Sequence, residues 1–234
     1  MVNNHLCRNL APKAWPISIK ETKWTIKPSS GPHAIQECIP VGLLLRNTLK
    51  LIKTARETRN ILQRKLVKVN NKIVHDQKLP LGLFDIIEIE NEKPRRLLLD
   101  ENNKFILVEA KHPNIKPSKV IGKRIMKNKK IQINFSDGKN LILDKDNYSV
   151  NDTVLFDLKT NKPLKTLKFE KNAKVYLTGG KHKGLTGTLE ETKIQSSKTK
   201  FDKISFKHEK KLYETQKDYA FVIDEEIIWI QCRK

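Results

Sequence analysis

The stretch TARETRNILQRKLVKVNNK, residues 54–72, decides the fold of the first half of this chain. Thr54 and Glu57 are spaced as in a capping box, so a helix is expected to begin directly after Thr54. Thr58 and Leu62 would share the buried face of that helix, because residues three or four positions apart lie on one side. A second face carries hydrogen-bonding side chains, those of Arg56, Arg59, Asn60 and Gln63.

The sequence on either side of this helix predicts a small α/β module. Two short β-branched runs follow the helix and are joined by Asn70-Asn71, which favours a tight hairpin because Asn tolerates a positive φ. The apolar segment 41–51 predicts a helix before it, and the segment 84–90 predicts a strand after the hairpin. The expected order is therefore helix, capped helix, hairpin and closing strand.

The chain is strongly basic for its size. Its 234 residues include 47 Lys and Arg against 26 Asp and Glu, which gives a formal net charge of +21. Such a surplus repels itself unless a polyanion neutralises it, and nucleic acid is the main candidate because each neutralised phosphate releases counterions. A lysine-rich surface that arises from biased composition is the alternative explanation of the same charge.

Several classes of protein are not expected from this sequence. No apolar run approaches the ~18 residues that a membrane span needs, and the first residues lack the pattern of a secretory signal. Cys7, Cys38 and Cys232 are sparse and form no C-x-x-C pair. This pattern predicts free thiols in the cytoplasm and no metal site. We also expect no cofactor.

Residues 1–40 predict an extended basic arm. Five prolines interrupt every periodic pattern, and such a segment buries too little apolar surface to fold alone, so it orders against its own domain or a partner. Trp15 and Trp24 either stack on RNA bases or pack on the next domain. The other arm residues expected to contact RNA are Arg8, Lys13, Lys20, Lys23, Lys27 and His33.

The second half of the chain predicts β structure in two parts, residues 109–170 and residues 171–234. In the first part, alternating apolar residues flank Asp137-Gly138, which predicts a hairpin turn, and nothing there indicates chemistry. The last part closes with two strand-like runs, residues 219–223 and 226–231.

A glycine-rich motif begins the last part, VYLTGGKHKGLTGTL at residues 175–189. Apolar residues alternate around Gly180, Gly184 and Gly187, and glycine is needed where the backbone has a positive φ or approaches a neighbour closely. The loop offers Lys181, His182 and Lys183 to a phosphate backbone. It matches neither a Walker A loop nor the G-x-G-x-x-G of a dinucleotide site, and a glycine-rich hairpin with no ligand is the alternative.

These motifs resemble known RNA-binding modules. Residues 54–72 resemble the RNA-binding domain of the ribosomal S-four superfamily, and residues 175–189 resemble a KOW motif. With the arm, in which Trp15-Pro16 and the run 28–33 match family phrases, the chain is similar over nearly its whole length to the four-e family of archaeal and eukaryotic small-subunit ribosomal proteins. Cys7 departs from the family pattern, which has a lysine there, and the short C-terminal end favours an archaeal-type member.

The resemblance implies an α+β, multidomain fold. Its expected parts are an extended basic arm at 1–40, an S-four-type RNA-binding domain at 41–108, a central β domain at 109–170 and a KOW-type barrel of the Src-homology-three-like class at 171–234. By the same resemblance, the RNA-gripping face of the S-four-type domain is formed by Lys53, Arg56, Arg59, Asn60, Gln63, Lys65 and Lys72. Arg46 and Arg64 are further basic residues of this domain that are expected to contact RNA.

The implied function is that of a structural constituent of the small ribosomal subunit. Such a protein binds small-subunit ribosomal RNA by electrostatic clamping, supports assembly and translation, lies beside other ribosomal proteins in a single copy, and takes no membrane or small-molecule partner. The alternatives are a non-ribosomal RNA-binding factor, a transcription elongation factor with a KOW domain, and an accessory part of an RNA-modifying enzyme. An enzyme is disfavoured because the aspartates of residues 109–170 have no His or Cys near them in the sequence to complete a catalytic set.

Overall fold

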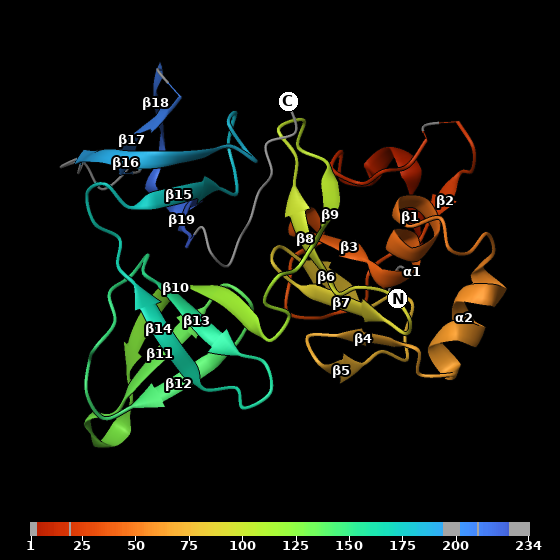
Figure 1. Cartoon of the computed structure of the whole chain (residues 1–234), viewed down its shortest axis with the longest axis horizontal. Helices are drawn as coiled ribbons and strands as arrows, with labels where there is room; N and C mark the ends of the chain where they lie inside the picture. The colour runs from red at the N-terminus through yellow and green to blue at the C-terminus, as the bar shows by residue number, and fades with distance from the viewer. Residues whose placement is uncertain (1–3, 19, 194–201, 210, 225–234) are drawn as a thin grey trace. The chain divides into compact units, whose positions relative to one another are not determined.

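The computed structural model describes residues 4–18, 20–193, 202–209 and 211–224, which divide between two compact units (Figure 1). The first unit contains residues 1–99 and 103–114, and the second contains residues 100–102 and 115–234. Strands predominate over helices in the described parts of both units, and they form five sheets. The predicted last strand at 226–231 and Cys232 lie outside the described residues.

A five-stranded antiparallel sheet forms the centre of the first unit, in the spatial order β5-β4-β7-β8-β9. Its strands are β4 (Val67–Val69), β5 (Lys72–Ile73), β7 (Ile86–Ile89), β8 (Arg95–Leu99) and β9 (Phe105–Glu109). Two small antiparallel pairs accompany it, β1 (Leu6–Cys7) with β2 (Trp24–Thr25), and β3 (Cys38–Pro40) with β6 (Pro80–Gly82).

The capped helix and the hairpin are confirmed. Helix α2 (Ala55–Gln63) begins at a complete capping box, in which the Glu57 backbone N–H donates to Thr54 Oγ1 over 3.2 Å. Thr58 and Leu62 are its buried residues, as the spacing predicts. The hairpin turns at Asn70 and Asn71, whose φ angles are 50° and 63°.

The apolar helix of residues 41–51 is shorter and less regular than predicted. Helix α1 (Val41–Leu43) continues directly into the π-helical turn η3 (Leu44–Thr48). The chain then leaves the helical path, because Lys50 has a φ of 53°. The closing strand also begins later than predicted, at Ile86, because Phe84 has a φ of 66°.

The arm packs on the rest of the first unit instead of extending freely. Its short elements are the 3₁₀ turns η1 (Arg8–Leu10) and η2 (Ile35–Glu37), besides β1 and β2. Trp15 is buried and its indole Nε1 donates to the Cys38 carbonyl over 2.6 Å. The Phe105 backbone N–H donates to the Ala14 carbonyl, so the arm is tied to the central sheet at β9.

The second unit contains two five-stranded antiparallel sheets, β12-β11-β10-β13-β14 and β18-β17-β16-β15-β19. The strands of the first are β10 (Ile115–Ile125), β11 (Ile131–Phe135), β12 (Asn140–Leu143), β13 (Thr153–Asp157) and β14 (Pro163–Leu167). Those of the second are β15 (Lys174–Leu177), β16 (Thr186–Lys193), β17 (Lys203–His208), β18 (Lys211–Gln216) and β19 (Ala220–Val222). Two 3₁₀ turns complete the unit, η4 (Lys127–Lys129) and η5 (Lys217–Tyr219).

Each of these sheets has its own apolar core. Phe135 and Phe156 meet edge to face in the first, with ring centroids 5.0 Å apart. The predicted turn at Asp137-Gly138 joins β11 to β12, with a φ of 75° at Gly138. Lys119 links the two sheets, because its buried ammonium group donates to the carbonyls of Asp218 and Ala220.

The part of the chain that the structure describes contains no helix long and apolar enough to cross a membrane.

Candidate nucleic-acid interface

Helix α2 presents an uninterrupted polar face to solvent. Arg56 and Arg59 are exposed and make no ion pair among the described residues. The exposed side chains beside them are those of Asn60, Gln63, Arg64 and Lys65. Guanidinium groups suit phosphate because their planar fork donates two parallel hydrogen bonds, and amide side chains can contact sugar or base edges.

The capping box leaves this face positively charged even though Glu57 lies in the first turn. One Glu57 carboxylate oxygen accepts hydrogen bonds from the backbone N–H groups of Lys53 and Thr54, over 2.9 and 3.3 Å. These bonds lower the pKa of Glu57. The carboxylate is therefore engaged at the helix N-terminus, and it makes no described ion pair with the arginines of α2.

A buried polar network ties the hairpin turn to the start of β7 and to the arm. Asp85 accepts hydrogen bonds from the Asn70 amide and from the Gly82 backbone N–H, both over 2.8 Å. His33 of the arm contacts the same carboxylate, with its Nε2 3.2 Å from Asp85 Oδ2. Gly82 leaves room for the His33 ring, because a Cβ on residue 82 would come within 2.3 Å of that ring. Lys72, at the hairpin, is exposed.

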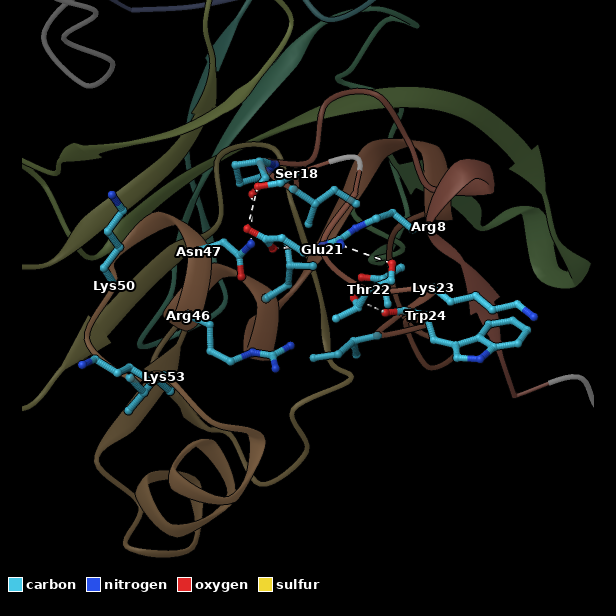
Figure 2. A pocket seen from close by; sticks show the side chains of 16 residues that line it. Arg8, Ser18, Glu21, Thr22, Lys23, Trp24, Arg46, Asn47, Lys50 and Lys53 are labelled. Carbon is cyan, nitrogen blue, oxygen red and sulfur yellow. Dashed lines mark hydrogen bonds and ion pairs between the residues drawn. The ribbon is translucent and has the colours of Figure 1, made fainter.

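A groove opens between the arm and the segment that connects α1 to α2 (Figure 2). Its volume is about 990 Å³. Lys50 and Lys53 lie on one side, Lys23 and Trp24 on the other, and the Arg46 guanidinium projects between them. Apolar side chains complete the lining, including Ile17, Ile26, Leu43 and Ile52.

The Arg46 side chain is held in position by a hydrogen bond, and its charged group is partly buried. Its Nε donates to the Gly42 carbonyl one turn earlier, over 3.1 Å. Partial burial lowers the pKa of Arg46, although an arginine remains charged at neutral pH. Its terminal nitrogens make no ion pair in the described chain, so an anion in the groove would restore the stabilisation that burial removes.

Three residues that the sequence predicts to contact RNA are in contact with groups of the protein itself in the structure. Trp15 is buried in the protein, where its indole nitrogen donates to the Cys38 carbonyl. Arg8 is buried and donates to the Thr22 carbonyl, with Glu21 3.5 Å away. His33 is engaged with Asp85. All three side chains hold the arm in place instead of facing solvent.

The other arm residues keep accessible positions. Lys13, Lys20 and Lys23 are exposed and Lys27 is partly buried. Trp24 is 51% exposed, with Lys23 Nζ 5.3 Å from its ring centroid and the His5 ring at 5.4 Å. Trp24 is therefore an available aromatic surface, in contrast to Trp15.

The glycine-rich loop of the second unit lies between β15 and β16. Gly180 and Gly184 have φ angles of 78° and 91°, and a Cβ on Gly187 would come within 2.6 Å of the Lys207 carbonyl. Lys181 is exposed at the turn and Lys183 is partly buried. His182 packs against Tyr213, with ring centroids 4.7 Å apart, so only part of it is accessible.

Sequence reasoning missed two groove residues, Asn47 and Lys50. Asn47 donates to the Pro16 carbonyl over 3.1 Å and so joins the two walls. Lys50 follows the π-helical turn, and its positive φ directs the chain along the groove. Lys50 falls inside the helix predicted for residues 41–51, and its place in the groove depends on the arm, which is distant in the sequence.

The interface offers charge and hydrogen-bond donors. Within the described ranges, no three His, Cys, Asp or Glu side chains gather where they could hold a metal ion. The buried Cys38 thiol has its pKa raised to about 12, chiefly by burial, and so remains protonated at neutral pH. The arrangement thus suits the binding of a polyanion through phosphate and sugar contacts.

Comparison with known proteins gives a consistent result along the chain. The sequence model of ribosomal family S4e matches residues 91–163, and that of the RS4NT (NUC023) domain matches residues 2–36. The small ribosomal subunit protein eS4 of Archaeoglobus fulgidus is 36% identical over 95% of this chain and 94% of its own length. The eS4 protein of Methanosphaera stadtmanae is also 36% identical, over 95% of this chain and 92% of its own length.

A solved structure shows the same similarity in three dimensions. The crystal structure of the 30S ribosomal protein S4e from Thermoplasma acidophilum matches with a TM-score of 0.70 and 27% sequence identity. The match covers 83% of this chain and 99% of that protein.

Proposed function

This chain belongs to the S4e family of small-subunit ribosomal proteins, and we propose that it holds ribosomal RNA through the α2 face, the hairpin and the groove of its first unit. Its function is that of a structural component of the small ribosomal subunit, which associates with ribosomal RNA and other ribosomal proteins. The match to relatives over 95% of the chain carries this conclusion. The non-ribosomal and enzyme-accessory alternatives are not favoured.

The mechanism we propose is electrostatic clamping. Arg56 and Arg59 are exposed, close in space on one helical face and free of described ion pairs, so they are available to neutralise phosphates. The RNA-contacting set contains the accessible basic and polar side chains, namely Lys13, Lys20, Lys23, Lys27, Arg46, Lys53, Arg56, Arg59, Asn60, Gln63, Arg64, Lys65 and Lys72. Arg8, Trp15 and His33 serve instead to position the arm.

The second unit supplies a second contact in this proposal. The sheet β18-β17-β16-β15-β19 is taken as a KOW-type barrel, and the positive φ angles of Gly180 and Gly184 support that assignment. Its loop would reach RNA mainly through Lys181, with Lys183 and the accessible edge of His182 beside it. The central sheet β12-β11-β10-β13-β14 has a structural role.

The wider cellular role follows from membership of the ribosome. We assign the chain to cytoplasmic ribosomes, in one copy per small subunit, with a contribution to assembly and translation. In this proposal the chain needs no catalytic residue, cofactor, metal or small-molecule substrate.

Filter binding of the purified full chain to small-subunit ribosomal RNA at several salt concentrations tests the clamp. The double variant Arg56→Ala/Arg59→Ala should reduce the slope of log affinity against log salt by ~1.4 to 1.8, since each lost phosphate contact removes ~0.7 to 0.9. Lys104→Ala, an exposed residue outside the α2 face, is the control for loss of charge. An unchanged slope in the double variant would contradict the assignment of α2 as the grip.

A further inference from the structure

The groove between the arm and residues 43–53 is hollow, and both cationic and apolar side chains line it (Figure 2). Its volume of about 990 Å³ lies at the upper end of the range of ligand pockets, which is ~300 to 1,000 Å³. A phosphate contact alone needs only an exposed cation. A hollow of this size with apolar side chains in its lining suits a flat heterocycle together with the charged groups attached to it.

The charges of the groove are strongly unbalanced. Five cationic side chains line it, those of Arg8, Lys23, Arg46, Lys50 and Lys53, and Glu21 is its one acidic residue. Glu21 is engaged within the arm, because its carboxylate accepts from Ser18 Oγ over 2.8 Å and lies 3.5 Å from Arg8. Among the described residues, no carboxylate of the groove lining therefore neutralises Lys23, Arg46, Lys50 and Lys53.

The groove also has polar atoms that are held in position. Asn47 is fixed by its amide hydrogen bond to the Pro16 carbonyl, which leaves its Oδ1 as an acceptor. Arg46 is fixed by its bond to the Gly42 carbonyl and keeps its terminal N–H groups as donors. Fixed donors and acceptors among apolar side chains are the usual means by which a pocket orients a bound ring.

We propose that this groove holds one unpaired nucleotide of the bound RNA, with its phosphates on Arg46 and Lys50 and its base against the apolar side chains of the lining. The nucleotide is unpaired because a base within an A-form helix cannot turn its face into a protein pocket, whereas a splayed base can. It belongs to a longer chain because cations continue on both sides, at Lys23 beside the exposed Trp24 and at Lys53 beside α2. This inference rests on the proposed RNA-binding function.

The test is zero-length crosslinking between the purified full chain and small-subunit ribosomal RNA that contains 4-thiouridine, followed by mass spectrometry of the crosslinked peptides. The same complexes are probed with a reagent that modifies unpaired nucleotides. We expect crosslinks within residues 16–26 or 43–53, and one unpaired nucleotide that becomes protected when the wild-type chain binds.

Two variants and one control make the test specific to the groove. Arg46→Gln should weaken RNA binding about tenfold, since it removes a charge-assisted hydrogen bond, and should abolish both the groove crosslink and the protection. Lys50→Gln, at an exposed position where folding is not at risk, should reduce the same two signals. Lys104→Gln, also exposed and outside the groove, should leave them unchanged.

The outcomes separate this inference from the proposed function. If the wild-type chain binds RNA tightly but crosslinks only outside the groove, or if both groove variants protect the nucleotide as the wild type does, the inference is wrong and the proposed function stands. Groove crosslinks that come only from base-paired nucleotides would also overturn it. A wild-type chain that does not bind small-subunit RNA would overturn both.

Discussion

Replacement of Trp15 distinguishes a residue that anchors the arm from one that binds RNA. Its side chain is 3% exposed, and its indole nitrogen donates to the Cys38 carbonyl over 2.6 Å across 23 residues of sequence. Phe keeps most of the ring but loses this hydrogen bond, so Trp15→Phe should lower the free energy of unfolding by about 1–3 kcal/mol. Trp15→Ala also leaves a cavity and should cost about 3–5 kcal/mol.

Equilibrium unfolding in urea measures the first effect, and filter binding to small-subunit RNA measures the second at a temperature where the variant is folded. We expect Trp15→Phe to bind RNA with wild-type affinity, because the ring faces protein. Had the ring stacked on a base, the substitution would weaken binding without a matching loss of stability, since stacking on an aromatic contributes about 1–3 kcal/mol per base.

Trp24 provides the matched control on the same arm. It is 51% exposed, so Trp24→Ala should lower the free energy of unfolding much less than Trp15→Ala does. A Trp15→Phe variant that unfolds at the wild-type urea concentration and binds RNA more weakly would refute the assignment of Trp15 to the core.

Three further predictions concern stability. In a pH series of thermal unfolding, the advantage of the wild type over Glu57→Gln should be complete above about pH 4.5, because backbone hydrogen bonds lower the pKa of Glu57 in the folded state. The advantage should be lost as the pH falls through that lowered pKa, and an advantage that does not change with pH would contradict this. Burial lowers the pKa of Lys119 from 10.5 to about 8, so the folded chain releases this proton before the unfolded chain does. Stability should therefore rise between about pH 8 and pH 10.5 relative to Lys119→Met, measured by urea unfolding, and parallel curves would show that the ammonium is not buried. Gly184→Ala should lower the melting temperature more than Gly122→Ala. Gly184 has a φ of 91°, and a Cβ there would lie 2.3 Å from the Asp100 carbonyl, whereas a Cβ on Gly122 meets nothing within 4 Å. Equal melting temperatures of the two variants would contradict this reason for glycine at position 184.

Local patterns in the sequence predicted local structure well. The Thr54–Glu57 capping box, the Asn70-Asn71 turn and the Asp137-Gly138 turn are all present, because each depends on contacts between residues only a few positions apart. The exposed face of α2 follows from the same helical period.

Features that depend on distant contacts were not predictable from local patterns. The segment 41–51 is apolar throughout, yet the helix gives way to a π-helical turn and ends before Lys50, whose positive φ no periodicity reveals. Phe84 likewise has a positive φ, and the neighbouring Asp85 is bound by Asn70 and Gly82. Composition suggests a turn there but not its geometry.

Residues of the candidate site were likewise predictable only where a local pattern determines their exposure. Arg56 and Arg59 could be assigned to a surface from the helical period alone, and the structure exposes them. Arg8 and Trp15 could not be assigned to the interior, because their partners lie 14 and 23 residues away. A basic or aromatic residue in a proline-rich arm has the same appearance in the sequence whether it faces RNA or its own fold.

Sedimentation of a native cell lysate through sucrose gradients at rising salt tests the central claim most directly, with the chain followed by mass spectrometry. The account predicts that the wild-type chain migrates with the small ribosomal subunit and resists moderate salt, and that Arg56→Ala/Arg59→Ala dissociates at lower salt. A chain that remains in the light fractions at the lowest salt would contradict the account.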